Sequence, residues 1–230
     1  MESMTEKEII RAQALIFDMD GVITNTMPYH YQAWNQAFQE ICGRQLDETD
    51  VYLREGSKGS FALSEIFDQY GWDYDMELLD KVLARKEEIF SAVVKMEFID
   101  GAEDFLKEIS CLGFQMALVT GTSRDELNRM LSADIQSYFS VSVTGSDVTS
   151  GKPEPEPYLS AVRQLNISPE DVCVLENAPL GIRSAKAAGL RCLALETSLS
   201  KKFLTEADFI FHSYTDMMEK IEFRYSGRDA

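Results

Sequence analysis

The stretch ALIFDMDG, residues 14–21, is an apolar run that stops at two acidic residues and a glycine. Four consecutive apolar side chains, from Ala14 to Phe17, are typical of a strand that is buried on both faces of a parallel sheet. The end of this strand would deliver Asp18 and Asp20 into a loop. We therefore expect a first strand that presents two carboxylates at its carboxyl end.

Short apolar runs continue along the chain and alternate with helical periodicity. The runs predict strands at 115–119, 141–144, 172–175, 192–195 and 209–211. The intervening patterns predict helices at 102–111, 124–131, 156–165 and 180–188. Gly113 and Gly189 end two of these helices, and Ser123 with Glu126 forms the S-x-x-E pattern of a capping box. This alternation predicts an α/β fold, a Rossmann-like parallel sheet flanked by helices.

Residues 27–96 interrupt this alternation. They carry three successive helical patterns and no strand pattern. We interpret them as a small α-helical domain, called the cap below, that is inserted after the first strand. Residues 1–26 and 97–230 would then form the core domain.

The composition limits the partners. A formal net charge of −17 argues against nucleic acid and anionic membranes, which need clustered Lys and Arg. A small anionic metabolite is still allowed, because local cations dominate a pocket at physiological salt. The charged N-terminal residues and the lack of a long apolar run favour a cytoplasmic location. The oligomeric state cannot be read from the sequence, and a monomer is compatible with it.

Polar residues at strand ends are the candidates for chemistry, because open parallel sheets bind ligands there. Carboxylates two residues apart, Asp18 and Asp20, can divide the roles of nucleophile and acid/base, although a D-x-D pair alone is also common in solvated turns. Thr120 and the amides after it can donate hydrogen bonds to phosphoryl oxygens. Lys152 lies in SGKPEPEPY, where three prolines stiffen the loop that follows it.

Two further strand-end residues suggest a metal. Glu176 and Asn177 end the run VCVLE and precede a helix that begins at a proline. Taken alone, they are equally consistent with an incidental acid and a helix cap. Together with Asp18 and Asp20 they offer oxygen ligands only, which suits Mg²⁺ because this ion takes one or two carboxylates and keeps water and substrate phosphate.

Four segments in order resemble the motifs of the haloacid dehalogenase superfamily of phosphotransferases. They are FDMDGVITNT (17–26), LVTGTS (118–123), SGKPEPEPY (150–158) and LENAPLGIRSAKAAG (175–189). The segment DGVITNTMPYHYQAW (20–34) is similar to the β-phosphoglucomutase-like group, whose helical cap follows the first strand.

This resemblance implies roles for core residues. Asp18 would be the nucleophile, and Asp20 the acid/base that also lends its backbone carbonyl to magnesium. Thr120 and Lys152 would bind the transferring phosphate, and the adjacent Gly121 and Thr122 would contact the substrate. Glu176 and Asn177 would complete the metal site.

The resemblance also implies roles in the cap. His30 matches the position that couples cap closure to Asp20. Arg54 and Lys86 match cationic positions that face the substrate. The chain departs from the family at Asn177, where Asp is usual; losing one charge should weaken magnesium binding and lessen repulsion of a phosphorylated ligand.

Several functions stay open on this evidence. The leading one is hydrolysis of a small phosphomonoester, a sugar phosphate above all, through an aspartyl-phosphate on Asp18. A β-phosphoglucomutase shares the first half-reaction and differs in the acceptor, which is a sugar hydroxyl in place of water. A non-catalytic phosphate-binding protein or a receiver-like signalling module is a more distant alternative.

Overall fold

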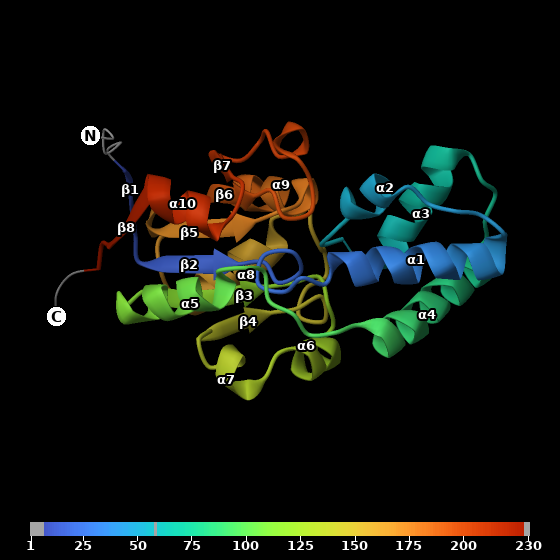
Figure 1. Cartoon of the computed structure of the whole chain (residues 1–230), viewed down its shortest axis with the longest axis horizontal. Coiled ribbons are helices and arrows are strands. Elements are labelled where there is room, and N and C mark those ends of the chain that lie inside the picture. The colour runs from blue at the N-terminus through green and yellow to red at the C-terminus, as the bar shows by residue number, and fades with distance from the viewer. Residues whose placement is uncertain (1–6, 58, 228–230) are drawn as a thin grey trace.

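The computed structural model describes residues 7–57 and 59–227. Within these residues a parallel sheet has the strand order β4-β3-β2-β5-β6-β7 (Figure 1). The strands are β2 (Ala14–Phe17), β3 (Gln115–Val119), β4 (Val141–Val143), β5 (Val172–Glu176), β6 (Arg191–Leu195) and β7 (Phe209–Phe211). Each lies where an apolar run predicted a strand, and the expected α/β class is confirmed.

Strand β2 lies at the centre of the sheet, between β3 and β5. All four of its side chains are buried, and Phe17 lies opposite Leu118 of β3 and Leu175 of β5. The three strands run in the same direction, so their carboxyl ends meet at one edge of the sheet. This register brings the residues that follow Phe17, Val119 and Leu175 together.

Helices flank the sheet on both faces. They are α5 (Ala102–Cys111), α6 (Arg124–Met130), α7 (Ala133–Gln136), α8 (Glu156–Leu165), α9 (Pro179–Ala187) and α10 (Tyr214–Lys220), with 3₁₀ turns η1 (Pro169–Asp171) and η2 (Lys201–Phe203). The predicted helix start is present at α6, where Ser123 is the N-cap and its Oγ accepts a hydrogen bond from Glu126 N at 3.3 Å. This N-cap hydrogen bond fixes the start of α6, soon after the chain leaves β3.

The cap residues form a separate helical group. It consists of α1 (Met27–Cys42), α2 (Glu48–Tyr52), α3 (Gly59–Tyr70) and α4 (Met76–Val93). Figure 1 shows this group beyond the arrowhead of β2, at the end of the molecule that the carboxyl ends of the strands face. Phe38 and Phe67, with ring centroids 5.3 Å apart, belong to its apolar interior.

The two chain segments that connect the cap to the sheet lie side by side. Asn25 N donates to Glu97 O at 2.8 Å, and Ile99 N donates to Ile23 O at 2.9 Å. Adjacent, paired linkers are what a hinged insertion requires. The division into a core domain and an inserted cap domain stays a prediction.

A second, two-stranded parallel sheet was not expected from the sequence. It pairs β1 (Glu8–Ala12) with β8 (Ile221–Tyr225), and Figure 1 shows it at the end of the molecule away from the cap. Each strand is short and only half buried, so neither gives a clear apolar run. In the described ranges no helix combines the length and the apolar character needed to cross a membrane; residues 1–6, which entered the argument on localisation, lie outside those ranges.

Candidate active site

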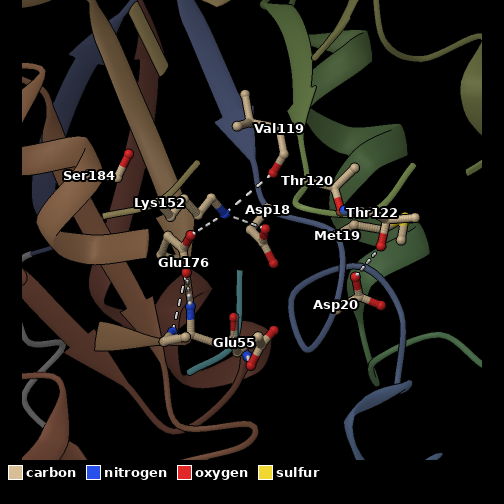
Figure 2. A network of polar contacts seen from close by, with 12 residues as sticks. Asp18, Met19, Asp20, Glu55, Val119, Thr120, Thr122, Lys152, Glu176 and Ser184 are labelled. Atoms are coloured by element: carbon tan, nitrogen blue, oxygen red, sulfur yellow. Dashed lines mark hydrogen bonds and ion pairs between the residues drawn. The ribbon is translucent and has the colours of Figure 1, made fainter. Parts of the chain in front are cut away.

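The ammonium of Lys152 connects the ends of three strands. Lys152 Nζ lies 2.5 Å from Asp18 Oδ1 and 2.7 Å from Glu176 Oε1, and 3.5 Å from the carbonyl oxygen of Val119. Figure 2 shows the carboxylates of Asp18 and Glu176 and the carbonyl of Val119 around this nitrogen. All of them are buried, so the sequence prediction that these residues meet is correct as geometry.

Burial and charge act together on this cluster. Burial raises the pKa of Asp18 to about 8, because the attraction of Lys152 does not fully offset the loss of water and the repulsion from Glu176 and Asp20. Burial acts to lower the pKa of Lys152, but the charges of Asp18 and Glu176 outweigh it and the pKa is raised. The ammonium is therefore firmly held, whereas Asp18, without a further cation nearby, keeps its proton up to about pH 8.

Glu176 is fixed by donors from several directions. Tyr158 Oη donates to its Oε1 at 2.7 Å, and the backbone N–H groups of Asn177 and Ala178 donate to its Oε2 at 2.9 and 3.2 Å. Gly181, in the first turns of α9, lies so close that a Cβ there would be 1.6 Å from Glu176 Oε1. The glycine in ENAPLG therefore makes room for the carboxylate.

Asp20 belongs to a different hydrogen-bond group from Lys152. Its Oδ1 accepts from Thr26 Oγ1 at 2.5 Å and lies 3.5 Å from His30 Nε2, and its Oδ2 accepts from Thr122 Oγ1 at 3.4 Å. Burial acts to raise its pKa, but the hydrogen bond and charge of His30 and the hydrogen bond of Thr26 hold the pKa below its ordinary value. Asp20 therefore favours the ionised form.

His30 and Lys86 form the cap wall next to Asp20. The imidazole of His30 stacks on Phe90 at a centroid distance of 4.0 Å. Lys86 Nζ lies 4.8 Å from the centroid of the same ring and 5.5 Å from that of Trp34. Burial lowers the pKa of Lys86, although Glu126 and Asp20 act to raise it. Both predicted cap residues thus reach the site.

Arg54, the third predicted cap residue, also lines the pocket, but its guanidinium is engaged within the cap. One terminal nitrogen donates to Asp50 O at 2.7 Å, the other donates to Gln69 Oε1, and Nε lies 3.7 Å from Glu65 Oε2. These contacts orient the planar group toward the cap. A direct role for Arg54 in substrate binding stays a prediction.

The loop after β3 supplies the other predicted substrate contacts. Thr120 is buried, and its Oγ1 accepts from Thr122 N at 3.1 Å. Gly121 is in close contact with the cap, since a Cβ on it would lie 2.8 Å from Gly56 O. Gly121 and Thr122 line the same pocket as Asp18 and Asp20.

Sequence reasoning missed Glu55, which comes from the cap loop after α2. Its side chain is 9% exposed, and its Oε2 accepts from Asn177 Nδ2 at 3.0 Å. Burial raises its pKa well above the ordinary value, and repulsion from Asp18, Asp20 and Glu176 adds to this. Its neighbour Arg54 was a predicted site residue, but no sequence signal distinguishes Glu55 from a solvated glutamate.

A pocket of about 840 Å³ lies between the cap and the strand ends. Its walls bring together the acids of the strand ends and the cations of the cap. The lining includes Asp18, Asp20, His30, Glu55, Lys86, Gly121, Thr122, Glu126 and Arg129. This size and this mixed polarity suit a small polar ligand with anionic groups.

The donor set fits a hard divalent cation. Asp18, Glu176 and Asn177 offer only oxygen atoms to it, and Asn177 Oδ1 is buried without a hydrogen-bond partner among the described residues. In the ranges 7–57 and 59–227, no group of three or more His, Cys, Asp or Glu side chains is arranged so that it could hold a metal ion by itself. The ammonium of Lys152 occupies the space between Asp18 and Glu176. A cation would therefore bind on the side of these carboxylates that faces Asn177.

Comparisons with known proteins agree with this geometry. A family model described as "Haloacid dehalogenase-like hydrolase" matches residues 15–195. A Thermotoga maritima protein named phosphorylated carbohydrates phosphatase is 32% identical over 189 residues, covering 77% of this chain and 82% of its own length. The β-phosphoglucomutase of Bacillus subtilis is 26% identical over 183 residues, 77% of this chain and 80% of that protein. The structure of CbbY from Rhodobacter sphaeroides in complex with phosphate is similar, with a TM-score of 0.75, 25% identity, and coverage of 90% and 96% of the two chains.

Proposed function

This chain belongs to the haloacid dehalogenase-like hydrolase family, and from this premise we propose that it hydrolyses a small phosphorylated sugar through an aspartyl-phosphate on Asp18. The observation that carries the proposal is the position of Asp18. Its buried carboxylate lies at a central strand end, 2.5 Å from Lys152 Nζ, on the wall of a pocket of about 840 Å³.

In the first half-reaction an oxygen of Asp18 attacks phosphorus, and the bond from phosphorus to the sugar oxygen breaks. Lys152, Thr120 and the amides of the 120–122 loop supply positive charge and donors to the phosphoryl oxygens. Asp20 gives the proton that the leaving sugar hydroxyl needs. Its pKa is low in the free protein, and the arriving phosphate charge raises that pKa, so that Asp20 takes up a proton from solvent as the substrate binds and releases it again when phosphate leaves.

In the second half-reaction water attacks the phosphorus of the aspartyl-phosphate. Asp20, now ionised, takes a proton from this water, and the bond from phosphorus to Asp18 breaks. Inorganic phosphate leaves, and both carboxylates return to their starting states. The hydrogen bonds of Asp20 to Thr26 and Thr122 orient its carboxylate for both transfers.

Magnesium is the proposed cofactor. Asp18, Glu176, Asn177 and the backbone carbonyl of Asp20 would hold it. When bound, it would supply positive charge that lowers the pKa of Asp18, so that the carboxylate is ionised for its attack, and that offsets the charge of the phosphoryl oxygens.

The substrate class is supported by the cap and by the relatives. Lys86 and His30 lie on the cap side of the pocket, where they can meet the polar groups of a sugar. The relative from Thermotoga maritima is named a phosphorylated carbohydrates phosphatase, and the matching family is described as hydrolases. A phosphorylated sugar is therefore the first substrate to test.

The test is phosphate release from a panel of sugar phosphates with Mg²⁺, comparing the wild-type protein with Asp18→Asn. We expect Asp18→Asn to reduce kcat by at least ~10³-fold, because the near-isosteric amide cannot attack phosphorus. Asp104→Asn, on an exposed face of α5, is the matched control and should keep full activity. Equal rates in the wild-type protein and Asp18→Asn would refute the mechanism.

The same panel separates hydrolysis from mutase activity. It includes β-glucose 1-phosphate with a trace of the 1,6-bisphosphate, followed by phosphorus NMR. Inorganic phosphate alone supports the proposal. Glucose 6-phosphate that appears in the wild-type protein and not in Asp18→Asn would show that a sugar hydroxyl accepts the phosphate in place of water.

A further inference from the structure

Two buried oxygen atoms at the contact between cap and sheet have no hydrogen-bond partner in the part of the chain that the structure describes. They are Glu55 Oε1 and Asn177 Oδ1. We propose that Glu55 is an additional ligand of the divalent cation, so that the cap supplies the carboxylate that Asn177 lacks and the bound cation fastens the cap loop to the strand ends. This inference rests on the magnesium site of the proposed function.

Glu55 Oε1 and Asn177 Oδ1 are buried oxygen atoms that need a partner. Buried polar atoms in folded proteins are nearly always paired with a donor, a water or an ion. Asn177 has already committed its amide nitrogen, which donates to Glu55 Oε2 at 3.0 Å and to Ser198 Oγ at 2.9 Å. What remains unpaired on the two side chains is one carboxyl oxygen and one amide oxygen, and a cation would satisfy both at once.

The buried carboxyl groups at the strand ends outnumber the ammonium beside them. Glu55, Asp18 and Glu176 are all at least nine-tenths buried, and Lys152 is the ammonium that bridges two of them. Glu55 lies on the Asn177 side of this group, as Figure 2 shows next to Glu176. One ammonium cannot balance three ionised carboxylates, and a divalent cation would stabilise all three in the ionised form that binds metal.

The contact between Asn177 and Glu55 gives a reason for asparagine at position 177. An aspartate there would place a second carboxylate where Asn177 Nδ2 now lies, 3.0 Å from Glu55 Oε2, and the two like charges would repel. Asparagine donates a hydrogen bond to Glu55 and keeps a carbonyl oxygen for the cation. The missing charge and the added cap glutamate are thus two parts of one arrangement.

The loop that carries Glu55 also fits closely against its neighbours. Gly56 has a φ of +80°, and a Cβ on it would lie 2.8 Å from Lys152 Cδ. On the other side, its carbonyl oxygen is in tight contact with Gly121. Only a residue without a side chain allows this approach, so the backbone places Glu55 directly against the strand ends.

The test measures Mg²⁺ binding directly, by titration calorimetry on the substrate-free protein. We expect Glu55→Gln to raise the Kd for Mg²⁺ by at least about tenfold. Gln keeps an oxygen that can accept from Asn177, so this change isolates the charge. Asn177→Asp added to Glu55→Gln should bring the Kd back to within about threefold of wild type. Glu77→Gln, which removes an exposed charge from the same cap, should leave the Kd unchanged.

A second readout follows the cap loop in the wild-type protein by amide hydrogen exchange. Mg²⁺ should slow exchange across residues 51–57, and it should not do so in Glu55→Gln. The proposal would be overturned if the Kd of Glu55→Gln for Mg²⁺ is within twofold of the wild-type value. It would also be overturned if amide exchange across residues 51–57 of the wild-type protein is the same with and without Mg²⁺.

These readouts do not depend on turnover. If the protein binds Mg²⁺ through Glu55 but releases no phosphate from any sugar phosphate, the proposed substrate fails and the ligand assignment stands. If phosphate is released normally while Glu55→Gln binds Mg²⁺ as tightly as wild type, the ligand assignment fails and the proposed function stands.

Discussion

Lys152 Nζ lies 2.5 Å from Asp18 Oδ1, although the two residues are 134 positions apart in the chain. The same nitrogen contacts Glu176 Oε1. One ammonium therefore joins the carboxyl end of β2, the loop before α8 and the end of β5. Because the whole group is buried, this contact serves the stability of the sheet edge as well as its chemistry.

Removing the Lys152 ammonium should destabilise the fold. Lys152→Met leaves Asp18 and Glu176 buried without their cation, which should lower the free energy of unfolding by ~3–5 kcal/mol at pH 7 without Mg²⁺. Urea denaturation measures this. Lys107→Met, at an exposed pair with Asp104, should change stability by less than ~0.5 kcal/mol.

A double variant checks the cause of that loss. Adding Asp18→Asn to Lys152→Met removes one of the two stranded carboxylates and should recover part of the stability. If the double variant is no more stable than Lys152→Met alone, lost packing of the lysine stem explains the effect better than charge.

Gly181→Ala should be harmful although alanine favours helices. In an ordinary helix interior this change gains ~1 kcal/mol. Here the new Cβ would lie 1.6 Å from Glu176 Oε1, so the carboxylate must leave the position it shares with Lys152 and Tyr158. We expect lower stability in urea and a Kd for Mg²⁺ raised by about tenfold or more.

The clash with Glu176 predicts non-additivity. In a Glu176→Ala background, Gly181→Ala has no carboxylate to displace and should recover the normal gain in helix stability. An equal loss of stability in both backgrounds would show that the constraint at Gly181 has another origin.

Replacing His30 should raise the pKa of Asp20. The hydrogen bond and charge of His30 stabilise the ionised carboxylate, so His30→Ala leaves burial as the dominant influence and the pKa moves upward. Carboxyl-detected NMR of ¹³C-labelled aspartate measures it, with the Asp20 signal assigned from Asp20→Asn. Phe90→Leu removes the stacking ring and keeps the imidazole, and should give a smaller shift.

Asp208 should contribute stability that depends on pH. Its carboxylate accepts from Lys186 Nζ at 2.7 and 2.8 Å and from Cys192 N at 2.7 Å. Burial acts to raise its pKa, but these partners hold it below the ordinary value of 3.8. The contribution is therefore fully present above about pH 3.8 and is lost as the pH falls through the lower folded-state pKa.

The expected size of the Asp208 contribution is ~1 kcal/mol, because the group is partly exposed to solvent. Urea titrations of wild type and Asp208→Asn should differ by this amount at pH 7 and converge in acid. Asp104→Asn serves as the exposed control and should track wild type throughout. A gap for Asp208→Asn that is the same at pH 7 and pH 3 would rule out the carboxylate charge as its source.

Local patterns were sufficient for the sheet and for the residues at its edge. Each apolar run, such as Ala14–Phe17, became a strand, because a fully buried strand needs apolar side chains on both faces. Asp18 and Glu176 could then be expected together, since parallel strands end at the same edge, whereas Lys152 was expected there through the family resemblance. The start of α6 at Ser123 could also be predicted, because an N-cap residue and its helix are neighbours in the chain.

Other features depend on contacts between distant segments. The β1–β8 pair could not be predicted, because each strand buries few side chains and gains its backbone hydrogen bonds only from the other end of the chain. The sequence predicted that Arg54 lies in the cap. It did not predict the hydrogen bonds of Arg54 to Asp50 and Gln69. Such pairings leave no periodic signal.

The amino-acid sequence by itself determined the parallel sheet and the carboxylates at its strand ends, since strand burial follows from local hydrophobicity and alternation with helices predicts parallel strands. Only the tertiary structure decided that Glu55 meets Asn177. That meeting requires the cap loop to fold back onto the strand ends and Gly56 to pass close to Lys152. In the sequence Glu55 is one acid among 39 acidic residues, and its burial beside other carboxylates is a property of the folded chain alone.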